Sequence, residues 1–231
     1  MRRSLQLSSG DRCRGQRSAL VAERDPAPRM RSPRWVLLAG LLLVAAGCSR
    51  SGSAGQNSPT EAAKQALAEY DANKDGALDP KELEACPALL AAFKRVDANK
   101  DGRLTEDEIA DRLSFFQKQG IQMDVSVEVS LDGRFLDGAT VTLEPEKFMG
   151  PSVKSASTVT DEAGSGNFKT EGSGEGAVAC GYYRVRVSKN AQGREVVPAK
   201  YNTQTVLGYE VSPDVEGRGS SSTLKLRLTS R

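Results

Sequence analysis

The sequence of 231 residues contains no histidine, and this absence removes several kinds of active site at once. Histidine is the commonest general base and the commonest zinc ligand, so Ser-His-Asp triads and H-E-x-x-H zinc sites are excluded. Aromatic residues make up only 5% of the chain, and its one tryptophan, Trp35, lies in the N-terminal segment. A large aromatic ligand cleft is therefore not expected, and any core must be mainly aliphatic.

The charge balance gives no sign of a nucleic-acid partner. The chain carries 32 basic and 30 acidic residues, but nine arginines and only three acids fall in residues 1–47. Residues 48–231 therefore hold 23 basic and 27 acidic residues, a net charge of −4. The excess of acids is local to residues 61–114, which contain 13 acidic and 8 basic residues. A mildly acidic body of this kind lacks the basic surface that nucleic-acid binding requires, so no nucleic acid is expected.

Residues 30–47 have the form of an export signal. Arg31 and Arg34 lead into the apolar run W-V-L-L-A-G-L-L-L-V-A-A-G, which is too short to span a bilayer comfortably and suits the hydrophobic region of a signal peptide. The alternative is a buried core helix, which the polar, Gly/Ser-rich sequence after the run disfavours. Residues 1–29 add a long Arg-rich stretch ahead of this signal, and we expect a non-native or disordered extension, with Met30 as an alternative start.

The segment A-A-G-C at residues 45–48 resembles the lipobox of bacterial lipoproteins, although Ala45 stands where a leucine is usual. The resemblance implies that Cys48 is lipidated, becomes the new N-terminus and anchors the protein to a membrane through several acyl chains. Ser49 in place of an aspartate implies the outer membrane of a bacterial cell envelope, with the protein facing the periplasm or the cell surface. Residues 48–58 show no apolar periodicity and predict a flexible tether.

Residues 59–118 contain two copies of a calcium-loop motif. The hexapeptide D-A-N-K-D-G occurs at 71–76 and 97–102, and each copy continues to a glutamate at the twelfth position. Both match the EF-hand pattern D-x-[DN]-x-[DN]-G-x5-E, in which alternate residues direct oxygen ligands at a hard cation. The predicted ligands of two Ca²⁺ ions are Asp71, Asn73, Asp75, the carbonyl of Ala77, Asp79 and Glu82 in loop one, and Asp97, Asn99, Asp101, the carbonyl of Arg103, Thr105 and Glu108 in loop two.

The sequence around the loops supports an EF-hand pair independently of the ligands. Apolar residues recur at helical spacing before each loop, and the capping box at 58–61 predicts where the first helix begins. Leu78 and Leu104 occupy the eighth loop positions, where paired hands form a short two-stranded contact. The alternative, two Asx-rich turns with accidental acids, does not explain this repeated pattern. Only 14 residues separate Glu82 from Asp97, and Pro87 interrupts them, which argues against a calmodulin-like opening.

Residues 121–231 change to a period of two, which is typical of strands. The longest alternating run extends from Ile121 to Leu131. About seven short strands predict a sandwich of the prealbumin or Ig-like type, so the fold class is α+β: a small all-α EF-hand pair followed by an all-β, seven-stranded sandwich. The other predicted strands lie at 139–143, 155–160, 167–170, 183–187, 206–211 and 224–228.

Four segments in this half carry a family resemblance. In order they are L-D-G-R-F-L-D-G-A-T-V-T-L-E-P-E, T-D-E-A-G-S-G-N-F-K-T, G-Y-Y-R-V-R-V-S-K and P-A-K-Y-N. Together they resemble the carboxypeptidase regulatory-like domains of bacterial lipoproteins, which have a transthyretin-type sandwich, over residues 122–229. Ser165 and Gly166 lengthen one turn relative to that family. The resemblance implies an accessory or structural domain without catalytic residues, so the protein is not expected to be an enzyme.

Two pairs of residues leave alternatives open. Cys86 is expected to be a small buried thiol, and the alternative is a disulfide with Cys180, since an oxidising compartment permits one. Glu144 and Glu146 flank Pro145 and could form a glycosidase carboxylate pair, but acids at a strand end are usually solvated.

The sequence thus predicts a calcium-binding, lipid-anchored envelope protein with a structural or protein-interaction role. Its partners would be the membrane, through Cys48, and an envelope protein or glycan. The alternative is a carbohydrate-binding or adhesion module, in which Tyr182, Tyr201 and Tyr209 would stack on sugars; strand and turn tyrosines are more often packing groups.

Overall fold

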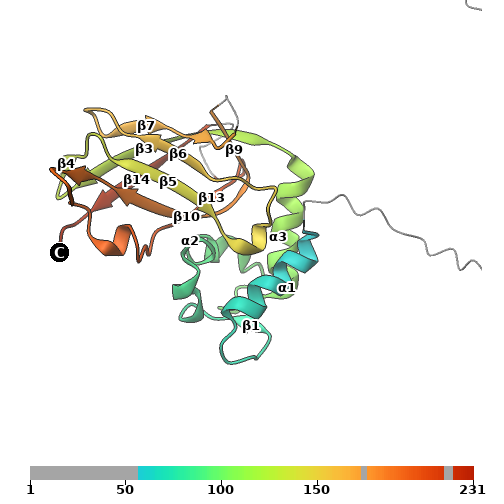
Figure 1. The fold of residues 1–231 in the computed structure, drawn as a ribbon. Coiled ribbons are helices and arrows are strands. Elements are labelled where there is room, and N and C mark those ends of the chain that lie inside the picture. The colour runs from blue at the N-terminus through green and yellow to red at the C-terminus, as the bar shows by residue number, and fades with distance from the viewer. Residues whose placement is uncertain (1–56, 173–175, 216–220) are drawn as a thin grey trace, which may run out of the picture. The chain divides into compact units, whose positions relative to one another are not determined.

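Helices form the first part of the chain and strands form the rest in the computed structural model (Figure 1). The structure describes residues 57–172, 176–215 and 221–231. The predicted signal peptide, Cys48 and most of the tether lie outside these residues. Within the described ranges, no helix is long and apolar enough to cross a membrane.

Three α-helices and one short 3-10 helix enclose the two calcium-loop segments. Ser58 caps the first helix, because its hydroxyl accepts a hydrogen bond from the backbone N–H of Glu61 at 3.2 Å. Proline at the first helical position of α1 and of α2 fixes the backbone dihedral there and removes an N–H that would lack a partner. The helices are α1 (Pro59–Tyr70), η1 (Glu82–Ala85), α2 (Pro87–Val96) and α3 (Glu106–Gln119), and the loops pair through β1 (Ala77–Leu78) and β2 (Leu104–Thr105).

The strands after α3 form two main sheets. One sheet has the order β13-β10-β5-β6-β8, and in the other β3 pairs with β14, β4, β7 and β9. The β3–β14 pair is parallel, whereas the other pairs are antiparallel. The strands are β3 (Gln122–Leu131), β4 (Arg134–Phe135), β5 (Thr140–Pro145), β6 (Ala156–Val159), β7 (Ser165–Asn167), β8 (Lys169–Thr170), β9 (Ala177–Ala179), β10 (Gly181–Ser188), β13 (Gly208–Val211) and β14 (Ser221–Leu228), with a hairpin of β11 (Asn190–Ala191) and β12 (Arg194–Glu195).

Strand alternation divides the β13-β10-β5 sheet into two chemically different faces. Val185 and Val187 of β10 and Leu143 of β5 point into the sandwich and are fully buried. The opposite face carries charged and aromatic side chains, among them Tyr182, Arg184 and Glu210. A face of that composition usually contacts water. Here Tyr182 and Glu210 are nevertheless buried, so another part of the chain covers this face.

The EF-hand module covers this outer face. Helix α2 packs against β13 and β10, and α1 packs against the short helix η2 (Lys147–Met149) that follows β5 (Figure 1). Gly208 of β13 makes the closest approach, since a Cβ atom built there would lie 2.0 Å from the backbone oxygen of Pro87. The buried apolar side chains of the module and the sandwich form one continuous cluster. The two halves are therefore parts of one compact unit.

The predicted fold class is confirmed: a helical EF-hand pair precedes a β-rich sandwich of two sheets. Each of the seven predicted strand runs contains a strand, but the structure adds the short strands β4, β9, β11 and β12. The run at 167–170 is divided between two sheets, because β7 pairs with β3 while β8 pairs with β6. Gly166 lies in β7, where a Cβ atom would be 2.6 Å from the hydroxyl of Thr158, so this glycine permits close packing.

Candidate calcium centre

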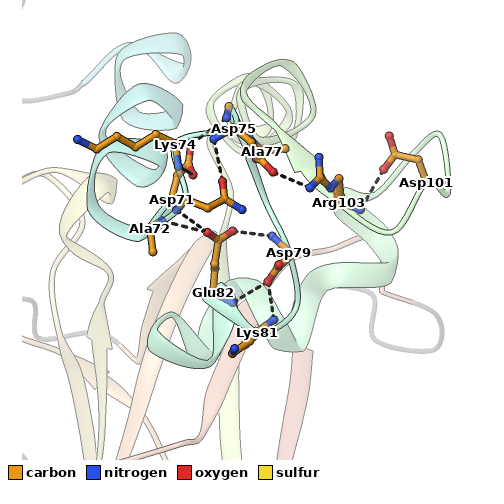
Figure 2. Close-up of polar contacts among 12 residues, drawn as sticks. Asp71, Ala72, Lys74, Asp75, Ala77, Asp79, Lys81, Glu82, Asp101 and Arg103 are labelled. Atoms are coloured by element: carbon orange, nitrogen blue, oxygen red, sulfur yellow. Dashed lines mark hydrogen bonds and ion pairs between the residues drawn. The ribbon is translucent and has the colours of Figure 1, made fainter.

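Glu82, the twelfth residue of loop one, folds back over the loop and contacts its backbone. Its Oε1 accepts hydrogen bonds from the N–H groups of Ala72 (3.0 Å) and Asn73 (3.2 Å). Its Oε2 accepts from the N–H of Asp79 at 3.0 Å (Figure 2). Helix η1 begins at Glu82, so the start of the exiting segment is held against the start of the loop. This is the side-chain direction that a twelfth-position ligand requires.

The other acidic side chains of loop one also turn inward. Asp71 accepts from the N–H groups of Lys74 (2.6 Å) and Gly76 (2.9 Å) through its two carboxylate oxygens. Asp79 accepts from Lys81 and Glu82, both at 2.8 Å, through Oδ1. These hydrogen bonds hold the carboxylate oxygens of Asp71 and Asp79 on the inside of the turn.

The side chains of Asn73 and Asp75 also point into loop one. The amide oxygen of Asn73 accepts from the N–H of Asp75 at 2.8 Å, and Asp75 Oδ1 accepts from the N–H of Ala77 at 3.1 Å. A hollow in the protein surface opens beside this loop and is lined by Asn73, Asp79 and Glu82 among others.

Loop two repeats the arrangement, with Thr105 in the place of Asp79. Glu108 Oε1 accepts from Ala98 (3.1 Å) and Asn99 (3.3 Å), as Glu82 does in loop one. The backbone N–H of Thr105 donates to Glu108 Oε2 at 3.0 Å, and the Thr105 hydroxyl accepts from the N–H of Glu108, which makes a capping box at the start of α3. Asp97 accepts from Gly102 at 3.1 Å and is itself buried.

The two identical hexapeptides adopt the same backbone conformation. Gly76 and Gly102 have φ angles of +85° and +84°, where a side chain would be strained. Lys74 and Lys100 also have positive φ angles, 61° and 62°. The same turn is therefore made twice. Leu78 pairs with Leu104 between β1 and β2, which confirms the predicted contact between the loops.

Arg103 joins the two loops electrostatically. Its guanidinium donates to Asp75 Oδ2 at 2.5 Å, across from loop two to loop one (Figure 2). Desolvation acts to raise the pKa of Asp75, but hydrogen bonds from Ala77 and Asn73 together with Arg103 outweigh it and lower that pKa. Asp75 is therefore held in its charged form, which is the form that a cation binds.

The donor set fits a calcium ion better than a transition metal. Each loop offers carboxylate, amide and carbonyl oxygens, and no nitrogen or sulfur ligand, which is the chemistry of a hard cation. Over the part of the chain that the structure describes, no group of three or more acidic or cysteine side chains is gathered so as to hold a metal ion. The loop carboxylates accept hydrogen bonds from backbone N–H groups. A carboxylate oxygen that accepts a single N–H has a second lone pair, so it can keep its N–H partner and also contact an ion.

Hand one contacts the sandwich on both sides of its loop. Before the loop, the Tyr70 hydroxyl donates to the buried carboxylate of Glu146 at 3.1 Å. After the loop, the Arg184 guanidinium donates to the carbonyl oxygen of Ala85 at 3.1 Å and also pairs with Glu146 at 3.3 Å. Burial raises the pKa of Tyr70, and the nearby charges of Glu146 and Glu69 raise it further. The expectation that Glu146 is solvated is wrong, because α1 and η1 cover this part of the sheet.

Hand two contacts the sandwich through Glu210, whose side chain is fully buried. Arg95 of α2 donates to Glu210 Oε2 at 2.5 Å, and Arg112 of α3 donates to Oε1 at 2.8 Å. Arg112 also donates to both carboxylate oxygens of Asp214, at 2.6 and 2.8 Å. Hydrogen bonds from Arg112 lower the pKa of Asp214 to about 2 against opposing desolvation. No local sequence signal marks this cluster, because the two arginines lie about a hundred residues before their acidic partners.

The remaining candidates from the sequence are packing groups or surface pairs. Tyr182 and Tyr209 are buried, so neither presents a ring for sugar stacking, whereas Tyr201 is partly exposed. Cys86 and Cys180 are both buried free thiols and do not form the alternative disulfide. Glu144 forms a partly exposed pair with Arg186 at 3.0 Å.

A cavity lined by uncharged residues lies away from the loops. It has a volume of about 260 Å³ and lies where α1 and α3 meet the start of β3. Its lining includes Gln117, Ser152 and Cys180 but no charged side chain from the described residues. It therefore offers no carboxylate pair for general acid and base chemistry.

Comparison with known families supports the EF-hand assignment. The family model described as EF hand matches twice, at residues 63–87 and 90–113, which contain the whole of loop one and of loop two. A search of curated proteins gives no match to the chain. The match supports an EF-hand pair and calcium binding.

Proposed function

We propose that this protein is a calcium-binding, lipid-anchored protein of the bacterial envelope in which calcium has a structural role. Calcium would order the two loops and the helices beside them, and the sandwich would present a surface to an envelope protein. A non-catalytic role is part of the proposal, since the polar groups near the loops are arranged as ligands and ion pairs.

The observation that carries this proposal is the packing of α2 on β13. Sensor EF-hands open on calcium binding and expose an apolar groove to a target. In this chain Ala88, Leu89 and Ala92 of α2 are already buried against the rest of the molecule. Opening would move this apolar surface away from the sandwich and expose it to water, at a free-energy cost of about 25 cal/mol for each Å² exposed. Calcium binding is therefore better suited to stiffen the docked module than to release a binding face.

Two sites would hold calcium through oxygen ligands alone. In loop one these are Asp71, Asn73, Asp75, the carbonyl of Ala77, Asp79 and Glu82, and in loop two Asp97, Asn99, Asp101, the carbonyl of Arg103, Thr105 and Glu108. Loop one has four carboxylates and loop two has three, so loop one should bind more tightly. Extracytoplasmic modules work with dissociation constants of roughly 10⁻⁴ to 10⁻³ M, and this range would suffice here.

Thermal unfolding with calcium or magnesium tests the structural role. We expect calcium to raise the Tm of the wild-type protein much more than magnesium at equal concentration, because the bidentate glutamates suit the larger ion. Glu82→Gln and Glu108→Gln should each remove part of the calcium effect. Far-UV circular dichroism should show little gain in helix, whereas exposure of a dye-binding apolar groove by calcium would contradict a structural role.

Lipid anchoring rests on the A-A-G-C segment and is tested separately. Expression in a bacterial host followed by intact-mass analysis should show a mature protein that begins at Cys48 and carries acyl chains. Cys48→Ser should leave an unprocessed or unlipidated chain in the soluble fraction. Recovery of the wild-type protein with an intact N-terminus and no lipid would contradict the anchor without touching the calcium proposal.

A further inference from the structure

The sandwich binds each EF-hand on both sides of its calcium loop without contributing a calcium ligand. For hand two, the contact is made by one buried carboxylate, Glu210 of β13. Its two oxygens are divided between two helices, with Arg95 of α2 on Oε2 and Arg112 of α3 on Oε1. Glu210 is thus a bridge between the helix that enters loop two and the helix that leaves it.

The positions of the two arginines make this bridge relevant to the loop. Arg95 lies two residues before Asp97, the first predicted ligand, and Arg112 lies four residues after Glu108, the last one. Asp97 follows the last turn of α2, and Glu108 lies in the first turn of α3. The angle between the helices therefore sets how the first and twelfth ligands face each other. A bond that fixes this angle also fixes the shape of the ligand cage.

Hand one shows the same arrangement with different chemistry. Tyr70, directly before the first ligand of loop one, donates to Glu146, and Arg184 pairs with Glu146 and donates to the carbonyl of Ala85. The polar pair on the sandwich therefore spans the entering helix α1 and the exiting segment η1. Two independent contacts with the same relation to their loops indicate that the outer sheet face is built to hold both hands.

We propose that Glu210 is a positioning residue for the second calcium site, so that the sandwich sets the calcium affinity of a loop to which it contributes no ligand. The proposal rests on the calcium-binding function proposed above. By thermodynamic linkage the effect is reciprocal, and calcium in loop two strengthens the docking of α2 and α3 on β13 by the same factor.

The direction in which replacement of Arg95 changes calcium affinity distinguishes a positioning role from a purely electrostatic one. Removing a positive charge beside a cation site should tighten calcium binding if only the field matters. If Arg95 acts by holding α2 to Glu210, its removal should weaken binding instead. The neighbouring Lys94 is exposed and supplies the matched control, because Lys94→Gln removes the same charge at the adjacent position.

The experiment is calcium titration calorimetry on the full chain in detergent. Every variant is made in a parent protein that carries Glu82→Gln, so that the titration reports calcium binding at loop two alone. In this parent we expect Arg95→Gln and Glu210→Gln to weaken calcium binding at least about fivefold, the lower end of typical coupling between sites. Lys94→Gln should leave affinity unchanged or tighten it. Glu144→Gln, which removes an acid from a partly exposed pair on the same sheet, should match the parent.

The outcomes are distinguishable. If the wild-type protein binds no calcium, the proposed function fails and the inference with it. If the wild type binds calcium but Arg95→Gln binds as tightly as Lys94→Gln, positioning by Glu210 is overturned and the proposed function stands. The same conclusion follows if the wild type binds but the parent does not, since loop two would then have no affinity to set. Because Arg95 is partly exposed, this variant decides the question even if Glu210→Gln fails to fold.

A measurement on the calcium-free protein completes the test. In calcium-free protein, amide hydrogen exchange at the end of α2 and the start of α3 should be faster in Arg95→Gln than in Lys94→Gln. Faster exchange confined to β13 would mean that Glu210 serves only the sandwich, and it would overturn the proposal.

Discussion

The guanidinium of Arg103 in loop two donates a hydrogen bond to the carboxylate of Asp75 in loop one. Asp75 is the predicted fifth-position ligand of loop one, while the predicted ligand at Arg103 is its backbone carbonyl. The Arg103 side chain of loop two therefore contacts a carboxylate that loop one would use to bind calcium. This contact is partly exposed, with 48% of the Arg103 side chain and 32% of the Asp75 side chain accessible, so its strength is modest.

Arg103→Gln should tighten calcium binding at loop one. The change removes a cation that competes for Asp75 and keeps the backbone carbonyl that loop two requires. Exposed ion pairs contribute about 0.2–1 kcal/mol, so we expect a gain of roughly 1.4-fold to fivefold, measured by calorimetry in a Glu108→Gln background. Lys64→Gln, at an exposed position of α1, controls for the lost charge. An equal gain in both variants would assign the effect to net charge alone.

Gly208→Ala should weaken the docking of the EF-hand module. A Cβ atom there would lie 2.0 Å from the oxygen and 2.3 Å from the nitrogen of the Pro87 and Ala88 backbones, so α2 must move. We expect a loss of about 1–3 kcal/mol in the free energy of urea unfolding. Gly181→Ala on the adjacent strand is the control, since its new methyl group meets only the flexible end of Met149, at 2.7 Å. Equal losses would contradict the close backbone contact.

Both described cysteines should resist alkylation in the native protein. Burial raises the pKa of Cys180 to about 11, and burial together with the charge of Glu146 raises that of Cys86 further. The thiolate is the reactive form, so iodoacetamide at about pH 8 should label neither residue until the chain unfolds in urea. Peptide mapping of the labelled protein checks this. Rapid labelling of Cys180 in the folded state would show that its cavity admits reagents and that the thiol is not held neutral.

Lowering the pH should remove the contribution that ionised Asp214 makes to the free energy of unfolding. Its folded-state pKa is about 2 against an ordinary value of 3.8, so the unfolded chain takes up the proton first as pH falls. The contribution is therefore complete above about pH 4 and lost as pH falls to about 2. Urea unfolding of wild type and Asp214→Asn across this range should show a difference that shrinks with acid. The difference should be small because the side chain is 40% exposed, and a difference independent of pH would contradict the pairing.

Local features of the sequence predicted the backbone geometry of the two loops well. The inward direction of Glu82 depends on residues at most twelve positions apart, and so do the turn at Gly76 and the cap at Ser58. The pairing of Leu78 with Leu104 followed from the equal position of both residues in their loops. Such features are set by backbone geometry and short-range hydrogen bonds, which a motif records directly.

The docking of the module could not be predicted, because it depends on residues far apart in the sequence. Glu210 is separated from Arg95 by 115 positions and from Arg112 by 98. Its neighbours in the sequence would predict only that Glu210 is an ordinary polar residue of a half-exposed strand. The same reason explains the error at Glu146, which a strand pattern places on the solvent face and the helical module then covers. Alternation shows which side of a sheet a residue lies on, but not what covers that side.

Counting the calcium ions bound by each chain tests the central claim most directly. Equilibrium dialysis of the purified full chain at millimolar calcium should give two ions per wild-type chain, one for Glu82→Gln, one for Glu108→Gln and none for the double variant. Circular dichroism would establish that all four proteins are folded. A folded wild-type chain that binds no calcium, or a double variant that still binds two ions, would contradict the assignment of these loops as the calcium sites.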